Sequence, residues 1–254
     1  MNDATHLKLI DFLGRSIDLL FTGLDSAKLR KVSRSQSFQV ALIARIHGRS
    51  DSVLTLLRED RDHSIGELVR SIHEAHASLV FLKKEKKARF RLEIESAEES
   101  IRLLRRLLTS PQLSIEMAKE ANQMLKAKEK RKKLLFSRGI RKATKADRMG
   151  FLDPVAKDIY GLLSSESHHD LLSLFDSHLD TSNGIVEFHG GRRRSDRTLI
   201  IYVAVILQAV HAAMKIVSGN LSKASYKQFW KDHVRQHTNL IVEVDRWGQS
   251  IVNA

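Results

Sequence analysis

Apolar residues recur every three or four positions along most of the chain, which is the spacing that gives an α-helix one apolar face. The first helix is predicted at residues 5–23. Its apolar stripe consists of Leu7, Ile10, Leu13, Ile17 and Leu20. Gly23 follows this stripe and is interpreted as a stop signal. Ser64 and Glu67 have the spacing of a capping box, so another helix is predicted to begin near Ile65.

The helical pattern continues to the end of the sequence. Further helices are predicted at residues 37–58, 65–82, 114–135, 154–165, 197–218 and 222–248. The charged stretch 83–106 is predicted to continue helical and to end before Pro111. The piece between Gly139 and Gly150 fits either a short helix or a loop. Residues 181–197 are rich in Asn and Gly and predict an irregular loop with at most a short strand.

Turn-forming residues are too scarce for a β-sandwich or barrel, because only 2 prolines and 12 glycines occur in 254 residues. We therefore expect an all-α helical bundle with a long C-terminal helical pair. The expected division is residues 1–36 as an N-terminal helix and linker, 37–180 as a helical core that includes the segment 126–148, and 181–254 as the loop and the C-terminal pair packed on that core.

Cysteine is absent, which excludes disulfides, thiolate zinc sites and cysteine nucleophiles. The first residues lack the pattern of a secretory signal. The apolar run 199–217 carries Gln208, His211 and Lys215 on one helical face, which favours a buried helix over a membrane span. These features predict a cytoplasmic protein with no membrane span.

Positive charge is the firmest functional signal. The chain carries 43 Lys and Arg against 30 Asp and Glu, a net charge of +13. Eleven of these cations, against two acids, lie in the segment 126–148, here called the basic run: Lys126, Lys128, Lys130, Arg131, Lys132, Lys133, Arg138, Arg141, Lys142, Lys145 and Arg148. Such density favours binding to a phosphate backbone, because bound phosphates release counterions. Phe136 is the only aromatic residue in the run, so contacts that do not read the bases are expected.

Other partners fit the same charge. The basic run is also explained as a solvated helix end, as a site for an acidic protein such as an antitoxin, or as a contact with anionic lipid. A homodimer is a further alternative. The triplet Arg192, Arg193 and Arg194 follows two glycines and forms a second candidate contact for phosphate, or a solvated loop.

Two predicted helices carry polar side chains on otherwise apolar faces. Arg70 and Glu74 are four residues apart, which makes them neighbours on one face. Tyr160, Ser164 and His168 are also spaced by four, so they share a face if the later helix extends that far. Their simplest explanation is structural, namely an ion pair with hydrogen bonds that fix the helix register.

These motifs resemble an uncharacterised family of bacterial helical proteins, whose pattern is an Arg-Ser…Glu helix followed by Tyr-x-x-Leu-Ser-x-x-x-His. The resemblance covers roughly residues 40–180. Proteins of this kind are similar in architecture to the HEPN superfamily of helical bundles. Many HEPN proteins are ribonucleases of toxin–antitoxin and phage-defence systems.

The HEPN resemblance implies a metal-independent endoribonuclease with no cofactor. Arg70 and His76 have the spacing of the HEPN ribonuclease motif. They lie early in the chain, whereas that motif usually lies near the end of the bundle. Arg70 would then stabilise the phosphorane, and His76 or His168 would move the proton of a ribose 2′-hydroxyl. Glu74, Tyr160 and Ser164 complete the candidate catalytic set. His73-Glu74-Ala75-His76 is one residue short of a zinc-protease motif, so no metal site is expected.

The sequence thus predicts an RNA-directed effector of bacterial defence or toxin type, with RNA preferred over DNA. The alternative is a non-catalytic helical module that binds nucleic acid or a protein partner. The residues alone leave open whether the protein is an enzyme.

Overall fold

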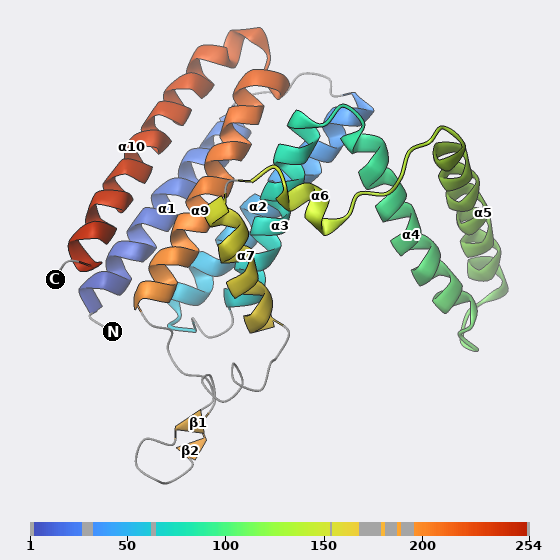
Figure 1. The fold of residues 1–254 in the computed structure, drawn as a ribbon, viewed down its shortest axis with the longest axis horizontal. Helices are drawn as coiled ribbons and strands as arrows, with labels where there is room; N and C mark the ends of the chain where they lie inside the picture. The colour runs from blue at the N-terminus through green and yellow to red at the C-terminus, as the bar shows by residue number, and fades with distance from the viewer. Residues whose placement is uncertain are drawn as a thin grey trace. The chain divides into compact units, whose positions relative to one another are not determined.

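The computed structural model describes residues 3–26, 33–61, 65–152, 154–167, 179–180, 187–188 and 196–252, and its regular structure is almost wholly helical (Figure 1). The α-helices are α1 (Asp3–Ser26), α2 (Arg34–Arg58), α3 (Ile65–Lys84), α4 (Ala88–Leu108), α5 (Ile115–Ser137), α6 (Lys145–Met149), α7 (Pro154–Ser167), α9 (Asp196–Ile216) and α10 (Lys227–Val252). A π-helical segment, η2 (Val217–Leu221), and a 3-10 turn, η3 (Ala224–Tyr226), connect α9 to α10. The predicted all-α fold is confirmed.

Two very short strands interrupt the helices. β1 (Leu179–Asp180) and β2 (Glu187–Phe188) pair antiparallel, with Leu179 opposite Phe188. They lie in and next to the region predicted as an irregular loop.

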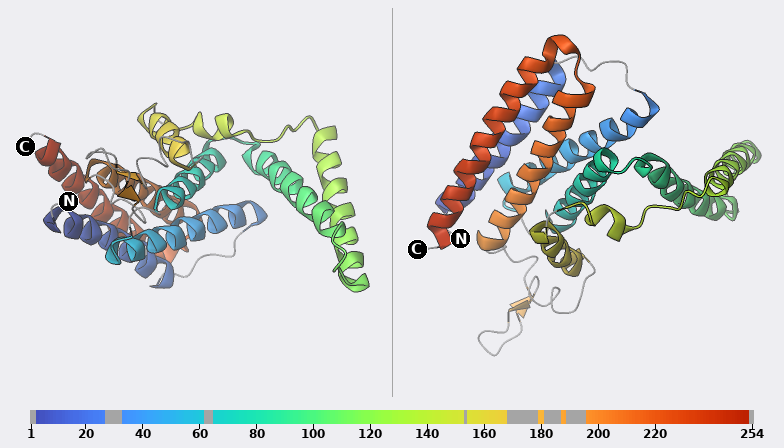
Figure 2. Two further views of the ribbon diagram at one scale, coloured as in Figure 1. Left: turned by 90° about the horizontal axis from the view of Figure 1, so that it is seen from below. Right: turned by 45° about the horizontal axis from the view of Figure 1, so that its top comes forward.

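The chain divides into two compact units, the larger formed by residues 1–80 and 152–254 and the smaller by Phe81–Phe151. Helix α1 belongs to the larger unit, where it shares one apolar core with α2, α3, α7, α9 and α10. The two termini of the larger unit lie side by side, since α1 and α10 run along each other in each view (Figures 1 and 2).

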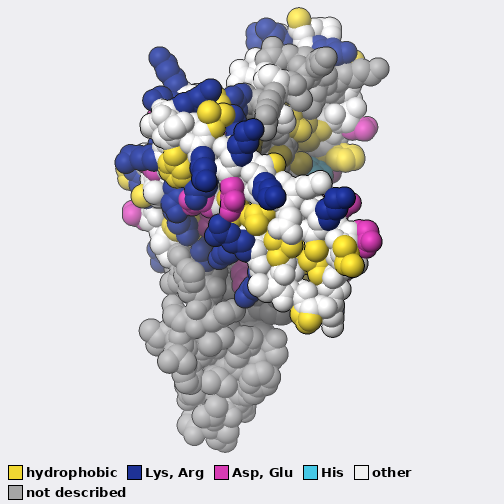
Figure 3. Space-filling model, turned by 90° about the vertical axis from the view of Figure 1, so that its right-hand side faces the viewer, with side chains coloured by type: hydrophobic (Ala, Val, Ile, Leu, Met, Phe, Trp, Pro, Cys, Tyr) yellow, Lys and Arg dark blue, Asp and Glu magenta, His cyan; other side chains and the backbone are white. Residues whose placement is uncertain are grey.

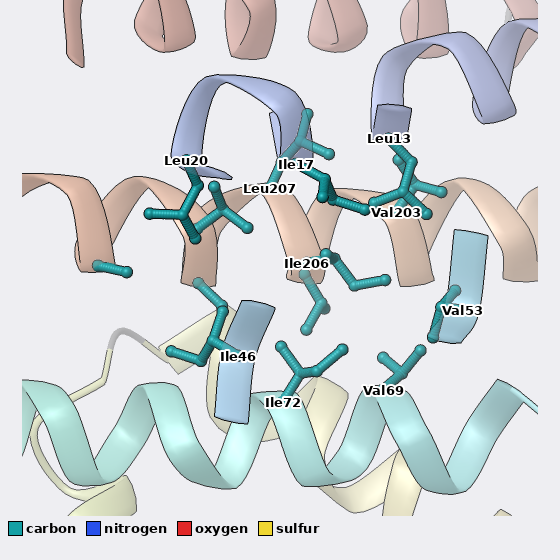
Figure 4. Close-up of a cluster of buried hydrophobic side chains, with 14 of the residues drawn as sticks. Leu13, Ile17, Leu20, Ile46, Val53, Val69, Ile72, Val203, Ile206 and Leu207 are labelled. Carbon is teal, nitrogen blue, oxygen red and sulfur yellow. The ribbon is translucent and has the colours of Figure 1, made fainter. Parts of the chain in front are cut away.

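Helix α9 is the centre of the larger unit. Over half of its residues are buried, from Leu199 to Ile216, because it is apolar on nearly every side. Figure 4 shows Leu13, Ile17 and Leu20 of α1 on one side of Val203, Ile206 and Leu207, and side chains of α2 and α3 on the other. The segment Asp196–Leu221 is long and apolar enough to cross a membrane, but 61% of its apolar window is buried inside the bundle, as in a core helix.

Two polar side chains, Ser16 and His237, meet inside this core. His237 of α10 is fully buried, and its Nε2 lies 2.7 Å from the Ser16 hydroxyl of α1. Its ring stacks on His211 of α9 with centroids 5.4 Å apart. Burial lowers the pKa of both imidazoles to about 4, and Lys215 adds to this effect at His211.

The smaller unit has little apolar core. Ile94 of α4 packs with Leu135 of α5 and with Ile140, and a second small cluster joins Phe81, Ala88, Leu92 and Ala143. Helix α5 buries only Ala121 and Leu135. Polar interactions therefore have to hold much of this unit together.

One local prediction was wrong. Gly23 does not end α1, which continues to Ser26; instead, it makes room for Trp230, because a Cβ at Gly23 would lie 2.5 Å from that ring. The stretch 83–106 is helical as predicted except for a break after Lys84, which separates α3 from α4. There the Glu85 carboxylate accepts a hydrogen bond from the Lys87 amide, which replaces the helical bond.

The close packing at Gly23 predicts opposite effects for two glycine substitutions. Gly23→Ala should lower the free energy of unfolding by about 1–3 kcal/mol, because the new methyl group overpacks Trp230. Gly48→Ala in α2 is the matched control: nothing lies within 4 Å of its Cβ position, and alanine favours a helix by about 0.5–1 kcal/mol. Denaturant unfolding of both variants measures this, and equal effects would show that Trp230 does not require a glycine.

The buried histidines predict a loss of stability in mild acid. Their pKa values are about 4 in the folded protein and 6.5 ordinarily, so the unfolded chain binds more protons between these values. The contribution of these two histidines to the free energy of unfolding should be fully present above pH 6.5 and should fall as the pH approaches 4. Thermal unfolding across this range should show a shallower decline for His237→Gln than for the wild type. An unchanged slope would contradict a neutral buried pair.

Candidate functional site

Arg70 and Glu74 form an ion pair on α3. They are one helical turn apart, and the Arg70 Nε donates to Glu74 Oε1 at 3.2 Å. Their side chains are 18% and 35% exposed, so the pair is neither fully buried nor freely solvated. The predicted neighbours therefore do meet.

Tyr160 of α7 reaches the same carboxylate from 86 positions away in the sequence. Its hydroxyl donates to Glu74 Oε1 at 3.1 Å, and the Arg70 guanidinium lies 5.9 Å from the centre of its ring. One carboxylate oxygen thus accepts hydrogen bonds from a guanidinium and a phenol. This contact joins the two helices whose motifs the sequence analysis singled out.

Two imidazoles extend the cluster. His73 is 1% exposed and stacks on Tyr160 with ring centroids 6.1 Å apart. His76 is 9% exposed and lies edge-on to His73 at 6.3 Å. Because each helical residue turns by about 100°, the six steps from Arg70 to His76 point these side chains in different directions.

His73 was missing from the predicted catalytic set, although it lies three residues from Arg70 on the same helix and touches Tyr160. That spacing was the signal that could have found it. No group of three or more metal-binding side chains occurs among the residues that the structure describes. Other predicted site residues lie outside the description: the Ser164 side chain, His168, and Arg192, Arg193 and Arg194.

The basic run is divided between two faces of the smaller unit. Its inner cations pair with acids of α4: Arg131 with Glu93, Lys132 and Lys142 with Glu98, and Arg148 with Glu95. Asp147 is paired with Arg91, which holds the pKa of that carboxyl far below its usual range, with the Thr144 hydrogen bonds helping. Arg141 lies 4.0 Å from Asp147. These cations hold the unit together.

A second group of cations faces solvent. Lys126, Lys130, Lys133 and Arg138 are exposed, and no ion pair involves them among the described residues; Lys128 is half-buried. Figure 3, which looks onto α5, shows Lys and Arg side chains gathered over this unit. Lys119 is also exposed on α5 but was not predicted, because it precedes the basic run.

The charge of the protein is concentrated in one unit. Phe81–Phe151 carries 21 Lys and Arg against 9 Asp and Glu, a net charge of +12 out of +13 for the whole chain. The larger unit is therefore close to neutral. Segments outside the basic run contribute, including the lysines around Glu85 and the arginines at the end of α4.

Comparison with known proteins places part of this chain in a family. Residues 37–186 match the model of DUF5677, a family of unknown function. No curated protein and no solved structure matches the chain. The matched residues include Arg70, Glu74, Tyr160 and the entire smaller unit, and they agree in extent with the resemblance found at roughly 40–180. The likeness to HEPN proteins stays a prediction. Because the match covers more than half of the sequence, the chain belongs to the DUF5677 family.

Proposed function

We propose that this protein binds RNA and that its smaller unit, Phe81–Phe151, contacts the phosphate backbone. The concentration of +12 of the net charge in that unit carries the proposal. The larger unit is close to neutral as a whole, so apart from the triplet Arg192, Arg193 and Arg194 its charge gives a polyanion little reason to bind there. RNA is preferred over DNA, and a cytoplasmic site of action is proposed, on the sequence features and the HEPN resemblance.

The paired cations are poor candidates for this contact. Arg131 and Glu93 form two hydrogen bonds, of 2.7 and 3.0 Å, and this raises the pKa of the guanidinium. Binding a phosphate there would require breaking a bidentate pair. In the part of the chain that the structure describes, Lys126, Lys130 and Lys133 have no such partner, so they are the residues that we expect to bind.

Replacing three exposed lysines should therefore weaken RNA binding. In Lys126→Gln/Lys130→Gln/Lys133→Gln, we expect lower affinity for every RNA sequence and a log–log salt slope reduced by about 2 to 3, because each lost contact removes about 0.7 to 0.9. Fluorescence anisotropy at several salt concentrations measures both quantities.

The matched control removes the same charge from the larger unit. Lys223→Gln/Lys227→Gln/Lys231→Gln changes three exposed lysines there and should leave the slope almost unchanged. If both triple variants lose the same affinity, net charge alone governs binding and the smaller unit is not the RNA site.

RNA cleavage at the Arg70 cluster is a second candidate function. The meeting of the Arg70 guanidinium, the Glu74 carboxylate and the Tyr160 phenol, with the His73 ring stacked on Tyr160, favours it. In the reaction that the HEPN resemblance implies, the ribose 2′-oxygen attacks the phosphorus and gives its proton to a base. The 5′-oxygen leaves and takes up a proton, giving a 2′,3′-cyclic phosphate and a 5′-hydroxyl. Arg70 would stabilise the phosphorane, and His76 or His168 would move the proton. An effector role in bacterial defence or as a toxin stays a prediction of that resemblance.

Two measurements on the same variants separate catalysis from a structural role. If Arg70 is catalytic, Arg70→Ala should reduce cleavage of a mixed RNA substrate about a hundredfold or more with little change in melting temperature. If the cluster is structural, Arg70→Ala and Tyr160→Phe should each lower stability by about 1–3 kcal/mol, because the Glu74 carboxylate loses a donor. Wild-type protein that cleaves no RNA, or that a chelator inactivates, would contradict a metal-independent ribonuclease.

A further inference from the structure

Helix α5 has one face made entirely of exposed polar residues. This outer face consists of positions 119, 123, 126, 130, 133 and 137, which recur at three- and four-residue steps. The residues are Lys119, Gln123, Lys126, Lys130, Lys133 and Ser137, and all six are exposed. The face contains four cations and neither an acid nor an aromatic ring.

The inner cations cannot add to this face. Arg131 and Lys132 lie on the other side of α5 and are held by Glu93 and Glu98 of α4. Among the described residues, acids pair with these inner cations and not with the lysines of the outer face. The unpaired charges are therefore aligned along one side of α5. A straight helix rises by 1.5 Å per residue, so Lys119 and Lys133 are about 21 Å apart along its axis.

Such a face suits a rigid array of phosphates better than a flexible strand. A duplex holds its phosphates at fixed positions, at about one charge per 1.7 Å of axis, so a fixed row of lysines can meet several of them together. A single strand is usually bound in a groove that stacks its bases on aromatic side chains. Phe136, the aromatic residue at this end of α5, is off the outer face, and the Lys132 ammonium lies 5.5 Å from its ring centre.

The type of cation on the outer face also affects whether the base sequence of a nucleic acid can be recognised. Lysine is a point charge on a flexible stem, whereas arginine makes the bidentate contacts that distinguish bases. The outer face contains lysine and no arginine. It can therefore hold a backbone without selecting a sequence.

We infer that the outer face of α5 binds the backbone of a double helix, independently of its sequence, in preference to a single strand. This inference rests on the proposed nucleic-acid binding and names its substrate class. RNA and DNA duplexes share the chemistry that the face recognises, so both are included as probes.

The test moves charges around α5 without changing composition. Exchanging exposed residues of α5 gives the swap variant Lys126→Ala/Ala127→Lys and Lys133→Met/Met124→Lys, which moves two lysines to about 80° and about 140° from the centre of the outer face. All four positions are exposed, and net charge stays at +13. The matched control is Lys223→Ala/Ala224→Lys, an exchange of two exposed neighbours in the larger unit.

Binding of the full chain is measured by anisotropy with an RNA duplex and a DNA duplex of about 20 base pairs, longer than the roughly 21 Å lysine span, and with an unstructured single strand of equal phosphate number. We expect the wild type to bind the duplexes about tenfold more tightly than the single strand at one salt concentration. The swap variant should lose about fivefold or more of its duplex affinity and less than about twofold of its single-strand affinity, since a flexible strand follows displaced charges. The control exchange should change neither.

Other results would overturn either the duplex inference or the proposed function. Equal affinity for duplex and single strand, or an equal loss for both in the swap variant, overturns the duplex inference and leaves nucleic-acid binding standing. No binding to any probe by the wild type overturns the proposed function itself. Circular dichroism and melting temperature show that both exchanges fold, and each single exchange on α5 is a second variant in case the double one does not.

Discussion

The ion pairs between α4 and the inner cations of the basic run are the constraint on which the smaller unit depends. Its apolar clusters are small, and a unit with a net charge of +12 repels itself. Glu93, Glu95 and Glu98 relieve this repulsion where the helices meet. The same pairing engages the inner cations and leaves the lysines of the outer face exposed, which is why the proposed nucleic-acid contact is assigned to that face.

The larger unit depends on an apolar core, in contrast to the ion pairs of the smaller unit. Helix α9 lies in a core that it shares with α1, α2, α3, α7 and α10, and this core is apolar except for a few polar groups such as Ser16, His211 and His237. Its candidate site lies apart from that core chemistry, where Glu74 accepts hydrogen bonds from Arg70 and Tyr160. A carboxylate that joins two helices in this way restricts their register. The geometry is equally what a structural network needs, which is why stability and cleavage must be measured together.

Sequence periodicity was enough to predict the helical class and most helix positions, because an apolar stripe every three to four residues has one structural solution. It also predicted the Arg70–Glu74 pair, which depends only on local spacing. It could not predict the break after Lys84, since that depends on the Glu85 side chain replacing one backbone bond. Nor could it show that Gly23 serves Trp230, a contact across more than 200 residues. The division of the basic run into bound and exposed cations required knowing which face of α5 meets α4.

The most direct test of this account is lysine reactivity measured by mass spectrometry with and without an RNA duplex. Chemical acetylation under mild conditions reports which ammonium groups are accessible. If the outer face holds the phosphate backbone, Lys119, Lys126, Lys130 and Lys133 should become protected when RNA is added, while Lys223, Lys227 and Lys231 stay reactive. Lys132, already paired with Glu98, should react slowly in both states. Uniform protection of lysines over both units, or none on α5, would contradict a docking face on this helix.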